Sequence, residues 1–410
     1  MIKAFIQRVK GLRRELALFF AVSFGVGLGG SLVESTLNNF LNDTYTLTGF
    51  QRSFLEIPRE GPGFLVMFVA ALVWFLGIRK MGILALVMYA AGVLLIGAIS
   101  TSYAVIMGFL FLYSMGMHLF LPVATTMGME LAADGRTGTR LGQLNAVRNM
   151  AMIVGSGLVF LGFKYLNFTY STSFIIAAVV VLVAAVLLFT MREQIEAPVR
   201  SGLKLRKEYG LFYLLAVLFG SRKQLFITFA PWVIVTIFNK PTQVIATLIT
   251  IGGVFGILFQ PFLGRAIDKF GERRILMAEA LVFVVVCLGY SLSGSLFSEN
   301  TAFLIVCGCY LIDQVLMSVG MARSTYIKKI ALQPSDIQPA LSASLTIDHF
   351  FSIIIALLGG VVWSMFGYQA VFLAGTVIAG LNFFFASRIR IPNKTISPQE
   401  ILLSIPTPRD

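Results

Sequence analysis

The sequence has 410 residues, of which 57% are hydrophobic and only 12% are charged, and its mean hydropathy is +0.86. So little polar surface cannot cover a water-soluble globule of this size, and most of the chain must therefore lie in lipid. The formal net charge of +13 does not indicate a nucleic-acid partner, because the basic residues fall between apolar runs and do not gather on one soluble segment.

A helix needs about 20 mainly apolar residues to cross the hydrocarbon core of a bilayer, because no backbone polar group can be left unpaired there. Twelve segments of the sequence meet this requirement. We predict membrane spans over residues 16–40, 50–77, 81–100, 103–128, 139–163, 171–190, 210–238, 242–264, 275–296, 301–322, 339–364 and 367–387. The expected fold is therefore an all-α membrane protein with twelve transmembrane helices.

The segment that precedes the first span, residues 1–15, is basic and amphipathic. We expect either that it lies along the inner membrane surface in contact with anionic lipid, or that it serves only to set the topology.

The basic residues are distributed unequally between the two sides of the predicted membrane. One side carries only Arg52, Lys164 and Lys240. The other side carries clusters within residues 3–14, 79–80, 136–140, 192–207, 265–274, 323–329 and 388–409. The positive-inside rule then predicts that both chain termini are cytoplasmic. We expect a multi-pass monomer in the plasma (inner) membrane.

A basic linker over residues 191–209 divides the predicted spans into two groups of six. The expected domains are an N-terminal six-helix bundle (16–190) and a C-terminal six-helix bundle (210–387), followed by a cytoplasmic tail (388–410). Many transporters are built from two such related halves, with a binding site at the middle of the membrane between them.

A short charged loop between the eighth and ninth predicted spans reads Gly264-Arg-Ala-Ile-Asp268-Lys-Phe-Gly271-Glu-Arg273-Arg274. The matching loop of the first half, which runs from Gly77 to Gly82, keeps a Lys-x-Gly sequence but has no acidic residue. The Gly264–Arg274 loop resembles the conserved cytoplasmic loop motif G-x-x-x-D-x-x-G-R-R of the major facilitator superfamily, with the basic pair displaced by one position.

The topology of the whole chain is also similar to that superfamily. The resemblance implies its two-bundle fold and a latch that stabilises the outward-open state. By resemblance, the latch residues are Gly264, Asp268, Gly271, Arg273 and Arg274. The fifth span lacks the Gly-Pro pair typical of the superfamily's drug and proton antiporters, although it contains Gly155, Gly157 and Gly162.

The predicted spans contain many ionisable residues, although a charge at the centre of a bilayer costs about 2.5–3.5 kcal/mol on insertion scales. They are Glu34, Glu56, Arg59, Glu60, His118, Arg148, Arg222, Lys223, Asp313, Asp348 and His349. Spans three, six and twelve have none, and span nine has only Glu279 near its cytoplasmic end. This pattern predicts that spans 3, 6, 9 and 12 face lipid and that spans 1, 4, 7 and 10 line a cavity.

Individual roles follow from side-chain chemistry. Arg222 is the favoured anchor for a carboxylate or phosphate, with Lys223 as a pairing residue, although a structural ion pair between Arg222 and Asp313 is the competing interpretation. The candidates for proton carriers are the acidic residues Glu34, Glu56, Glu60, Asp313 and Asp348.

Other polar residues of the spans leave two interpretations open. Arg59 lies between Pro58 and Pro62, in a segment that forms either a kink used in gating or a local ion pair near the outer interface. The two histidines, His118 and His349, serve in packing or as a proton relay. No residues have metal-ligand spacing along the chain, so we expect no metal site and no cofactor.

These patterns predict a protein that is not an enzyme, because no catalytic constellation is present. The leading hypothesis is proton-coupled transport of a small organic solute, anionic or zwitterionic, by alternating access. Efflux of lipophilic cations is the second hypothesis, and a lipid scramblase or a membrane sensor on the same fold is the third. The expected partners are the substrate, a proton or other coupling ion, and membrane lipid.

Overall fold

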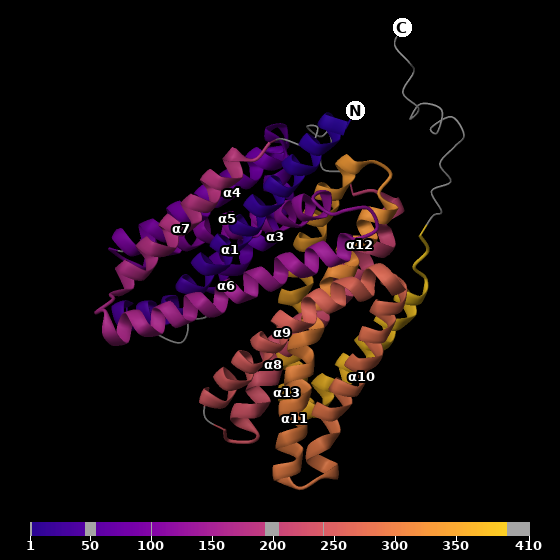
Figure 1. Ribbon diagram of the computed structural model, residues 1–410. Helices are drawn as coiled ribbons and strands as arrows, with labels where there is room; N and C mark the ends of the chain where they lie inside the picture. The colour runs from indigo at the N-terminus through magenta and orange to yellow at the C-terminus, as the bar shows by residue number, and fades with distance from the viewer. Residues whose placement is uncertain (1, 46–54, 100, 193–204, 241, 392–410) are drawn as a thin grey trace.

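The computed structural model describes residues 2–45, 55–99, 101–192, 205–240 and 242–391, and every regular element in these ranges is a helix (Figure 1). Ten of the described helical stretches are long and apolar enough to cross a membrane. The chain is therefore an integral, multi-pass membrane protein.

The helices fall into two groups in chain order (Figure 1). The N-terminal half contains α1 (Ile2–Tyr45), α3 (Glu56–Leu72), α4 (Gly77–Ala98), α5 (Tyr103–Glu130), α6 (Thr137–Tyr165) and α7 (Tyr170–Thr190). The C-terminal half contains α8 (Gly210–Thr236), α9 (Thr242–Phe270), α10 (Glu272–Leu296), α11 (Glu299–Leu316), α12 (Gly320–Ile330) and α13 (Ile337–Ser387). Short 3-10 turns lie at Trp74–Leu76, Lys207–Tyr209, Met317–Val319 and Pro334–Asp336.

Several helix boundaries differ from the predicted spans. The start of the second predicted span lies outside the described residues, and α3 has 17 residues. The eleventh and twelfth predicted spans run together as α13, with a kink at Gly367, whose φ is 80° and ψ is 171°. The basic segment at residues 1–15 continues into the first span, because α1 has no break between Ile2 and Tyr45.

Buried apolar side chains form two separate clusters. One is made of residues between Phe19 and Met191, and the other is made of residues between Tyr209 and Ile389 together with Met129 and Leu141. The outward faces of the helices are apolar as well: on α7, Val179, Val183 and Val186 are more than half exposed at helical spacing. An apolar surface of this kind is suited to contact with lipid tails.

Two glycines at equivalent turns of the two halves have the same backbone conformation. Gly77, between α3 and α4, has φ 73° and ψ 165°, and Gly271, between α9 and α10, has φ 83° and ψ 157°. Side chains disfavour this positive-φ region, so glycine permits both tight connections. Beside the first turn, Arg79 donates hydrogen bonds to the carbonyl oxygens of Phe189 and Met191, at the end of α7.

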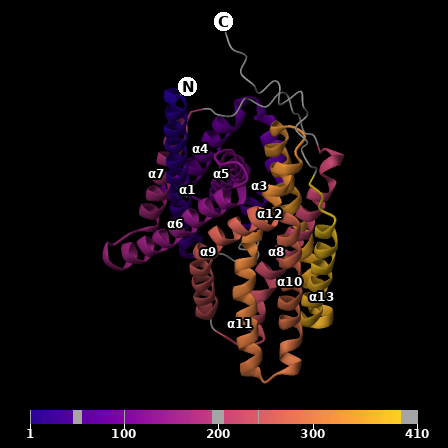
Figure 2. The ribbon, with the colours of Figure 1, turned by 45° about the vertical axis from the view of Figure 1, so that its right-hand side comes forward.

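The most extensive contacts between the halves are those of α6 with α9 and of α3 with α13, and α5 and α6 also touch α12 and α13. Figures 1 and 2 both show α6 beside α9, while the remaining helices of the halves diverge from this contact. A Cβ atom on Gly142 would overlap the backbone carbonyl oxygen of Gln260, and one on Gly138 would overlap that of Gly264. Glycines on both helices therefore permit backbone-to-backbone packing between the halves.

Candidate functional site

One contact between the halves is made by Asp268, on the last turn of α9. Its Oδ1 accepts a hydrogen bond from the backbone N–H of Gly138 at 2.8 Å, and its Oδ2 accepts from the backbone N–H of Thr139 at 2.7 Å. The Thr139 hydroxyl also donates to Oδ2 at 2.7 Å. These are free N–H groups at the amino-terminal end of α6, where a carboxylate is favoured by hydrogen bonding and by the helix dipole.

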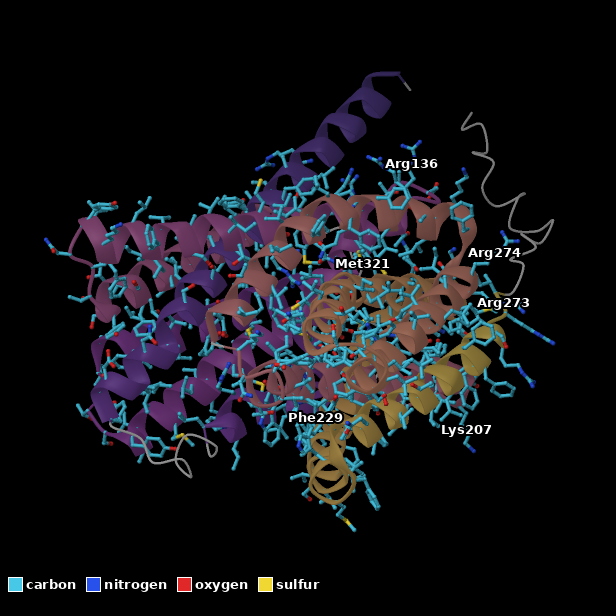
Figure 3. All side chains as sticks on the ribbon, turned by 90° about the horizontal axis from the view of Figure 1, so that it is seen from below. Arg136, Lys207, Phe229, Arg273, Arg274 and Met321 are labelled. Atoms are coloured by element: carbon cyan, nitrogen blue, oxygen red, sulfur yellow. The ribbon has the colours of Figure 1, made fainter. Side chains whose placement is uncertain are left out.

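A second contact on the same side is made by Lys328, near the end of α12. Its Nζ donates to the carbonyl oxygen of Met129 at 2.6 Å and to the hydroxyl of Thr137 at 3.1 Å. We call this side of the molecule, where Arg136, Lys207, Arg273 and Arg274 lie near one edge in Figure 3, the basic side. Asp268 and Lys328 therefore both join the two halves on the basic side.

The basic pair of the loop motif does not take part in this contact. Arg273 and Arg274 are exposed and form no ion pair with any described residue. The residue between Gly271 and this pair, Glu272, is buried instead and pairs with Lys329 at 2.7 Å. Asp268, the acidic residue of the motif, thus binds α6. Arg273 and Arg274, which the resemblance assigned to the latch, take no part in this contact.

The C-terminal half has a buried cluster of charges around Arg222 of α8. Its Nη2 lies 2.8 Å from Oδ1 of Asp313 on α11, and its Nη1 lies 3.1 Å from Oε1 of Glu279 on α10. The guanidinium also lies over the ring of Phe283, at 4.4 Å from the centroid. All three charged side chains are 5% exposed or less. Arg222 is therefore occupied by two carboxylates and lines neither of the two cavities described below.

The next residue of α8, Lys223, points toward α13. Its Nζ lies 2.6 Å from Oδ2 of Asp348. The two adjacent basic residues of α8 therefore each have an acidic partner on a different helix, as their angular separation of about 100° on a helix requires.

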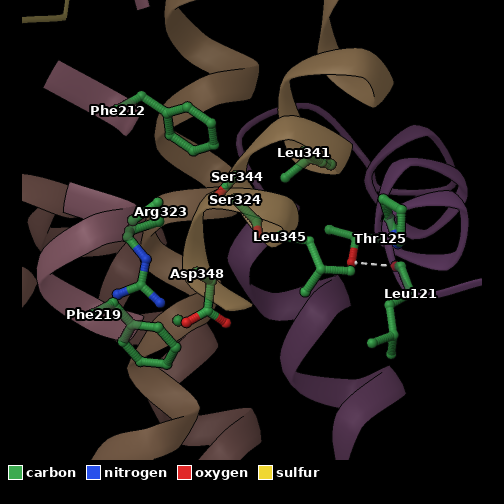
Figure 4. A pocket seen from close by; sticks show the side chains of 13 residues that line it. Leu121, Thr125, Phe212, Phe219, Arg323, Ser324, Leu341, Ser344, Leu345 and Asp348 are labelled. Atoms are coloured by element: carbon green, nitrogen blue, oxygen red, sulfur yellow. Dashed lines mark hydrogen bonds between the residues drawn. The ribbon is translucent and has the colours of Figure 1, made fainter. Parts of the chain in front are cut away.

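A cavity of about 160 Å³ lies between the halves and contains Arg323 and Asp348 (Figure 4). We call it the Arg323 cavity. The guanidinium of Arg323 lies 3.5 Å from the centroid of the Phe219 ring. Arg323 is only 8% exposed and has no ion pair within the described residues. The charge distribution along the sequence placed Arg323 on the cytoplasmic surface, but the structure places it inside the bundle.

A larger cavity, of about 310 Å³, lies within the N-terminal half. We call it the Arg148 cavity. Its polar lining residues include Ser23, Glu34, Asn145 and Arg148. The side chain of Arg148 makes no ion pair or hydrogen bond in the part of the chain that the structure describes, so its donors are available to a ligand.

The two cavities share a wall on α5. Leu121 and Thr125 line both of them, and the Thr125 hydroxyl donates to the carbonyl oxygen of Leu121 at 3.0 Å (Figure 4). This stretch of α5 therefore lies between the two cavities.

Glu34 of α1 stands at the rim of the Arg148 cavity. Its Oε2 lies 3.7 Å from the Arg59 guanidinium on α3, and its Oε1 accepts a hydrogen bond from the Tyr113 hydroxyl at 3.4 Å. The Glu34 side chain is 48% exposed. The side chain of Glu56 lies outside the described residues.

Glu60, His118 and His349 form a third polar cluster. The ring centroids of the two histidines are 4.8 Å apart, and His349 Nδ1 lies 3.1 Å from Glu60 Oε2. One potential metal-ligand atom from each residue lies within 4.8 Å of the others. The expectation of no metal site depended on spacing along the sequence, which cannot reveal a cluster formed by three separate helices.

Sequence reasoning missed two of the charged residues described above. Glu279 appeared to lie near a helix end, yet it is 3% exposed and pairs with Arg222. The sequence could have predicted the position of Glu279. It follows Gly271, at the start of the helix, by about two helical turns, which is far enough to place it inside the bundle. Arg323 was hidden by its proximity in sequence to Lys328 and Lys329.

The sequence matches a known family, and solved structures share the fold of the chain. Residues 16–322 match the family described as Major Facilitator Superfamily, and residues 212–403 give a second match to it. No curated protein matches the chain in sequence.

Solved structures share the fold over nearly the whole chain. The Escherichia coli fucose:proton symporter FucP, in the outward conformation, has 16% identity and a TM-score of 0.72, over 90% of this chain and 97% of its own. The human organic anion transporter MFSD10 has 13% identity and a TM-score of 0.72, over 92% and 99% of the two chains. A bacterial homologue of the iron transporter ferroportin, in an outward-facing state, has 12% identity and a TM-score of 0.73, over 92% and 100%.

Proposed function

This chain belongs to the Major Facilitator Superfamily, a family of transporters and not of enzymes, and on that premise we propose that it carries a small anionic or zwitterionic organic solute across the membrane by alternating access. The observation that carries this proposal is the unpaired guanidinium of Arg148, which lines a cavity of about 310 Å³. A charged guanidinium among membrane-spanning helices is costly without an anionic partner, and the chain itself supplies none to this half-buried one among the described residues.

The chemistry of the cavity walls supports an organic anion. A guanidinium can hold a carboxylate or a phosphate with two parallel hydrogen bonds, and Asn145 and Ser23 offer further polar groups. The aromatic side chains of Tyr89 and Tyr113 line the same cavity and suit the apolar part of such a solute. Arg323 adds a second unpaired cation in the neighbouring cavity.

Arg222 was the anion anchor that the sequence favoured, with Lys223 as its pairing residue, but neither residue supports an anionic substrate in the structure. Both are paired with acidic residues, at 2.8 Å to Asp313 and 2.6 Å to Asp348. Arg148 and Arg323 replace them in the proposal, because they line the Arg148 cavity and the Arg323 cavity and have no ion pair among the described residues.

For coupling, we assign the transported proton to the cluster of Arg222, Glu279 and Asp313. Two buried carboxylates share one guanidinium there, so the cluster carries an excess negative charge whenever both are ionised. Holding one proton removes that excess in a low-dielectric site. Glu34, which is exposed at the rim of the Arg148 cavity, is the second proton-carrying group of the proposal.

We place both chain termini in the cytoplasm and assign twelve spans, with α13 divided into two of them at Gly367. The basic side is then cytoplasmic by the positive-inside rule. Because Asp268 and Lys328 join the halves on that side, we assign the present arrangement to a state of the cycle that is closed to the cytoplasm. The protein acts as a monomer in the plasma membrane.

A binding screen tests the substrate class. Purified protein is heated with panels of carboxylates, organic phosphates, amino acids, neutral sugars and lipophilic cations, and its unfolding temperature is recorded. We expect stabilisation by members of the anionic or zwitterionic panels, lost in Arg148→Gln and kept in Lys164→Gln, which changes an exposed residue at the far end of the same helix. Stabilisation by the anion that persists in Arg148→Gln would contradict the proposal.

Efflux of lipophilic cations is a second candidate, favoured by one observation. The Glu34 carboxylate and the rings of Tyr89 and Tyr113 line the same cavity, and such rings attract cations through their faces. In the screen, this function requires stabilisation by the cation panel that disappears in Glu34→Gln and survives in Arg148→Gln.

A further inference from the structure

We propose that Glu60, His118 and His349 bind one divalent transition-metal ion of the zinc class at the contact between the two halves. These residues come from α3, α5 and α13, respectively, and each offers one nitrogen or oxygen atom within 4.8 Å of the others. Two imidazoles and one carboxylate are the ligand set that zinc and neighbouring metals prefer. The inference does not depend on the identity of the transported solute.

His118 is held in the tautomer that a metal requires. Its Nδ1 lies 2.9 Å from the backbone carbonyl oxygen of Ser114, which can only accept a hydrogen bond. In the neutral ring the proton is therefore on Nδ1, and the lone pair is on Nε2. Nε2 has no hydrogen-bond partner among the described residues. A hydrogen bond from the second ring nitrogen to a carbonyl group is the usual support of a metal-binding histidine.

The facing atoms of His349 and Glu60 are separated by about the distance expected between two ligands of one zinc ion. In a tetrahedral zinc site with bonds of about 2.0–2.1 Å, two ligand atoms lie about 3.3 Å apart. His349 Nδ1 and Glu60 Oε2 are 3.1 Å apart. A Cβ atom at position 63 would overlap the His349 ring at 2.6 Å, so Gly63 gives that ring its place against α3.

The three residues lie at one depth in the bundle. Glu60 is twelve residues before the end of α3 at Leu72, His118 is twelve residues before the end of α5 at Glu130, and His349 is twelve residues after the start of α13 at Ile337. At about 1.5 Å per residue each is about 18 Å from the basic-side end of its helix.

An ion can enter this cluster, and nearby charge does not prevent its binding. The Glu60 side chain is 48% exposed, whereas the residues His118 and His349 are 4% and 6% exposed, so one ligand is accessible from outside the packed helices and two are held by packing. The cation of neighbouring Lys223 is paired with Asp348 at 2.6 Å. Three protein ligands leave one coordination position for water.

Because the ligands come from both halves, a bound ion stabilises the present arrangement over any in which α13 moves away from α3 and α5. The ion is therefore an inhibitor of alternating access and holds the state in which the Asp268 contact on the basic side is closed.

The test is a calorimetric titration of tag-free purified protein with zinc chloride, repeated with cobalt(II) so that the absorption spectrum reports the ligand set. The wild type is expected to bind one equivalent. His118→Gln, His349→Gln and Glu60→Gln should each weaken binding by at least about 10- to 100-fold, because losing a ligand should cost no less than losing one of the outer-shell partners for which that range is typical. Glu299→Gln, which changes an exposed acid at the start of α11, is the matched control.

A parallel thermal measurement without metal establishes that each variant is folded. Zinc should then raise the unfolding temperature of the wild type and of Glu299→Gln, and leave that of the double variant His118→Gln/His349→Gln unchanged. Wild-type protein that binds no zinc, or a folded double variant that binds zinc as tightly as the wild type, would overturn the proposal. Loss of solute binding in Arg148→Gln with zinc binding unchanged would show that the two sites are independent.

Discussion

The carboxylate of Asp268, at the end of α9, accepts a hydrogen bond at 2.8 Å from the backbone N–H of Gly138, in the first turn of α6. The two residues belong to different halves of the chain. This hydrogen bond at the end of α6 must therefore break when the halves separate on the basic side. Its strength therefore contributes directly to the balance between conformations.

Replacing Asp268 with Asn should shift that balance toward states open on the basic side. The change removes the negative charge at a helix amino terminus and one of two accepting oxygens, which costs about 1 kcal/mol, or about fivefold in population. The measurement is the maleimide labelling rate of Ser324→Cys, which lines the Arg323 cavity, in a background without Cys287, Cys307 and Cys309. Glu208→Gln, an exposed acid on the same side, is the control. Equal labelling in Asp268→Asn and Glu208→Gln would refute the role of this hydrogen bond.

Gly142→Ala should also shift the balance toward states open on the basic side, in this case through packing. The new Cβ would overlap the backbone of Gln260, which cannot turn aside as a flexible side chain could. We expect a loss of about 1–3 kcal/mol from the closed state and a faster labelling of Ser324→Cys. The control is Gly157→Ala on the same helix, where a Cβ meets no atom within 4 Å. If both variants label at the wild-type rate, α6 and α9 do not form the contact that closes the basic side.

Removing the guanidinium from the buried cluster of the C-terminal half should destabilise the fold strongly. Arg222→Met leaves the carboxylates of Asp313 and Glu279 without their cation, which costs about 3–5 kcal/mol. The melting temperature in detergent should fall sharply, and less so in Asp313→Asn, because Arg222 then keeps Glu279 as its partner. Arg265→Met, at an exposed position of α9, should melt as the wild type does. A variant Arg222→Met that is as stable as Arg265→Met would rule out this ion pairing.

Much of the fold followed from hydropathy, because a bilayer requires long apolar helices whose backbone bonds are satisfied within each helix. The motif around Asp268 also predicted the family correctly, as the match over residues 16–322 shows. Helix ends were harder to predict. The continuous course of α1 from Ile2 and the joining of two predicted spans in α13 depend on backbone geometry that apolar composition does not specify.

The site was only partly predictable, because pairing is decided between helices. The sequence indicated that Arg222, Lys223, Asp313 and Asp348 lie in the membrane, but not that Glu279 competes for Arg222. Arg323 was assigned to the surface by its basic neighbours, although Phe219 covers it inside the bundle. Likewise, Glu60, His118 and His349 are separated by 58 to 289 positions in sequence and become one cluster only through the packing of α3, α5 and α13.

The central claim is that an organic anion is carried on the unpaired guanidinium of Arg148. Uptake of the stabilising solute into proteoliposomes, driven by an imposed proton gradient, measures this most directly. We predict that Arg148→Gln lowers the uptake rate at limiting solute about 10- to 100-fold, the equivalent of the about 1.5–3 kcal/mol of a hydrogen bond to a charged group, while Lys164→Gln transports at the wild-type rate. Uptake by Arg148→Gln at the wild-type rate would contradict the account.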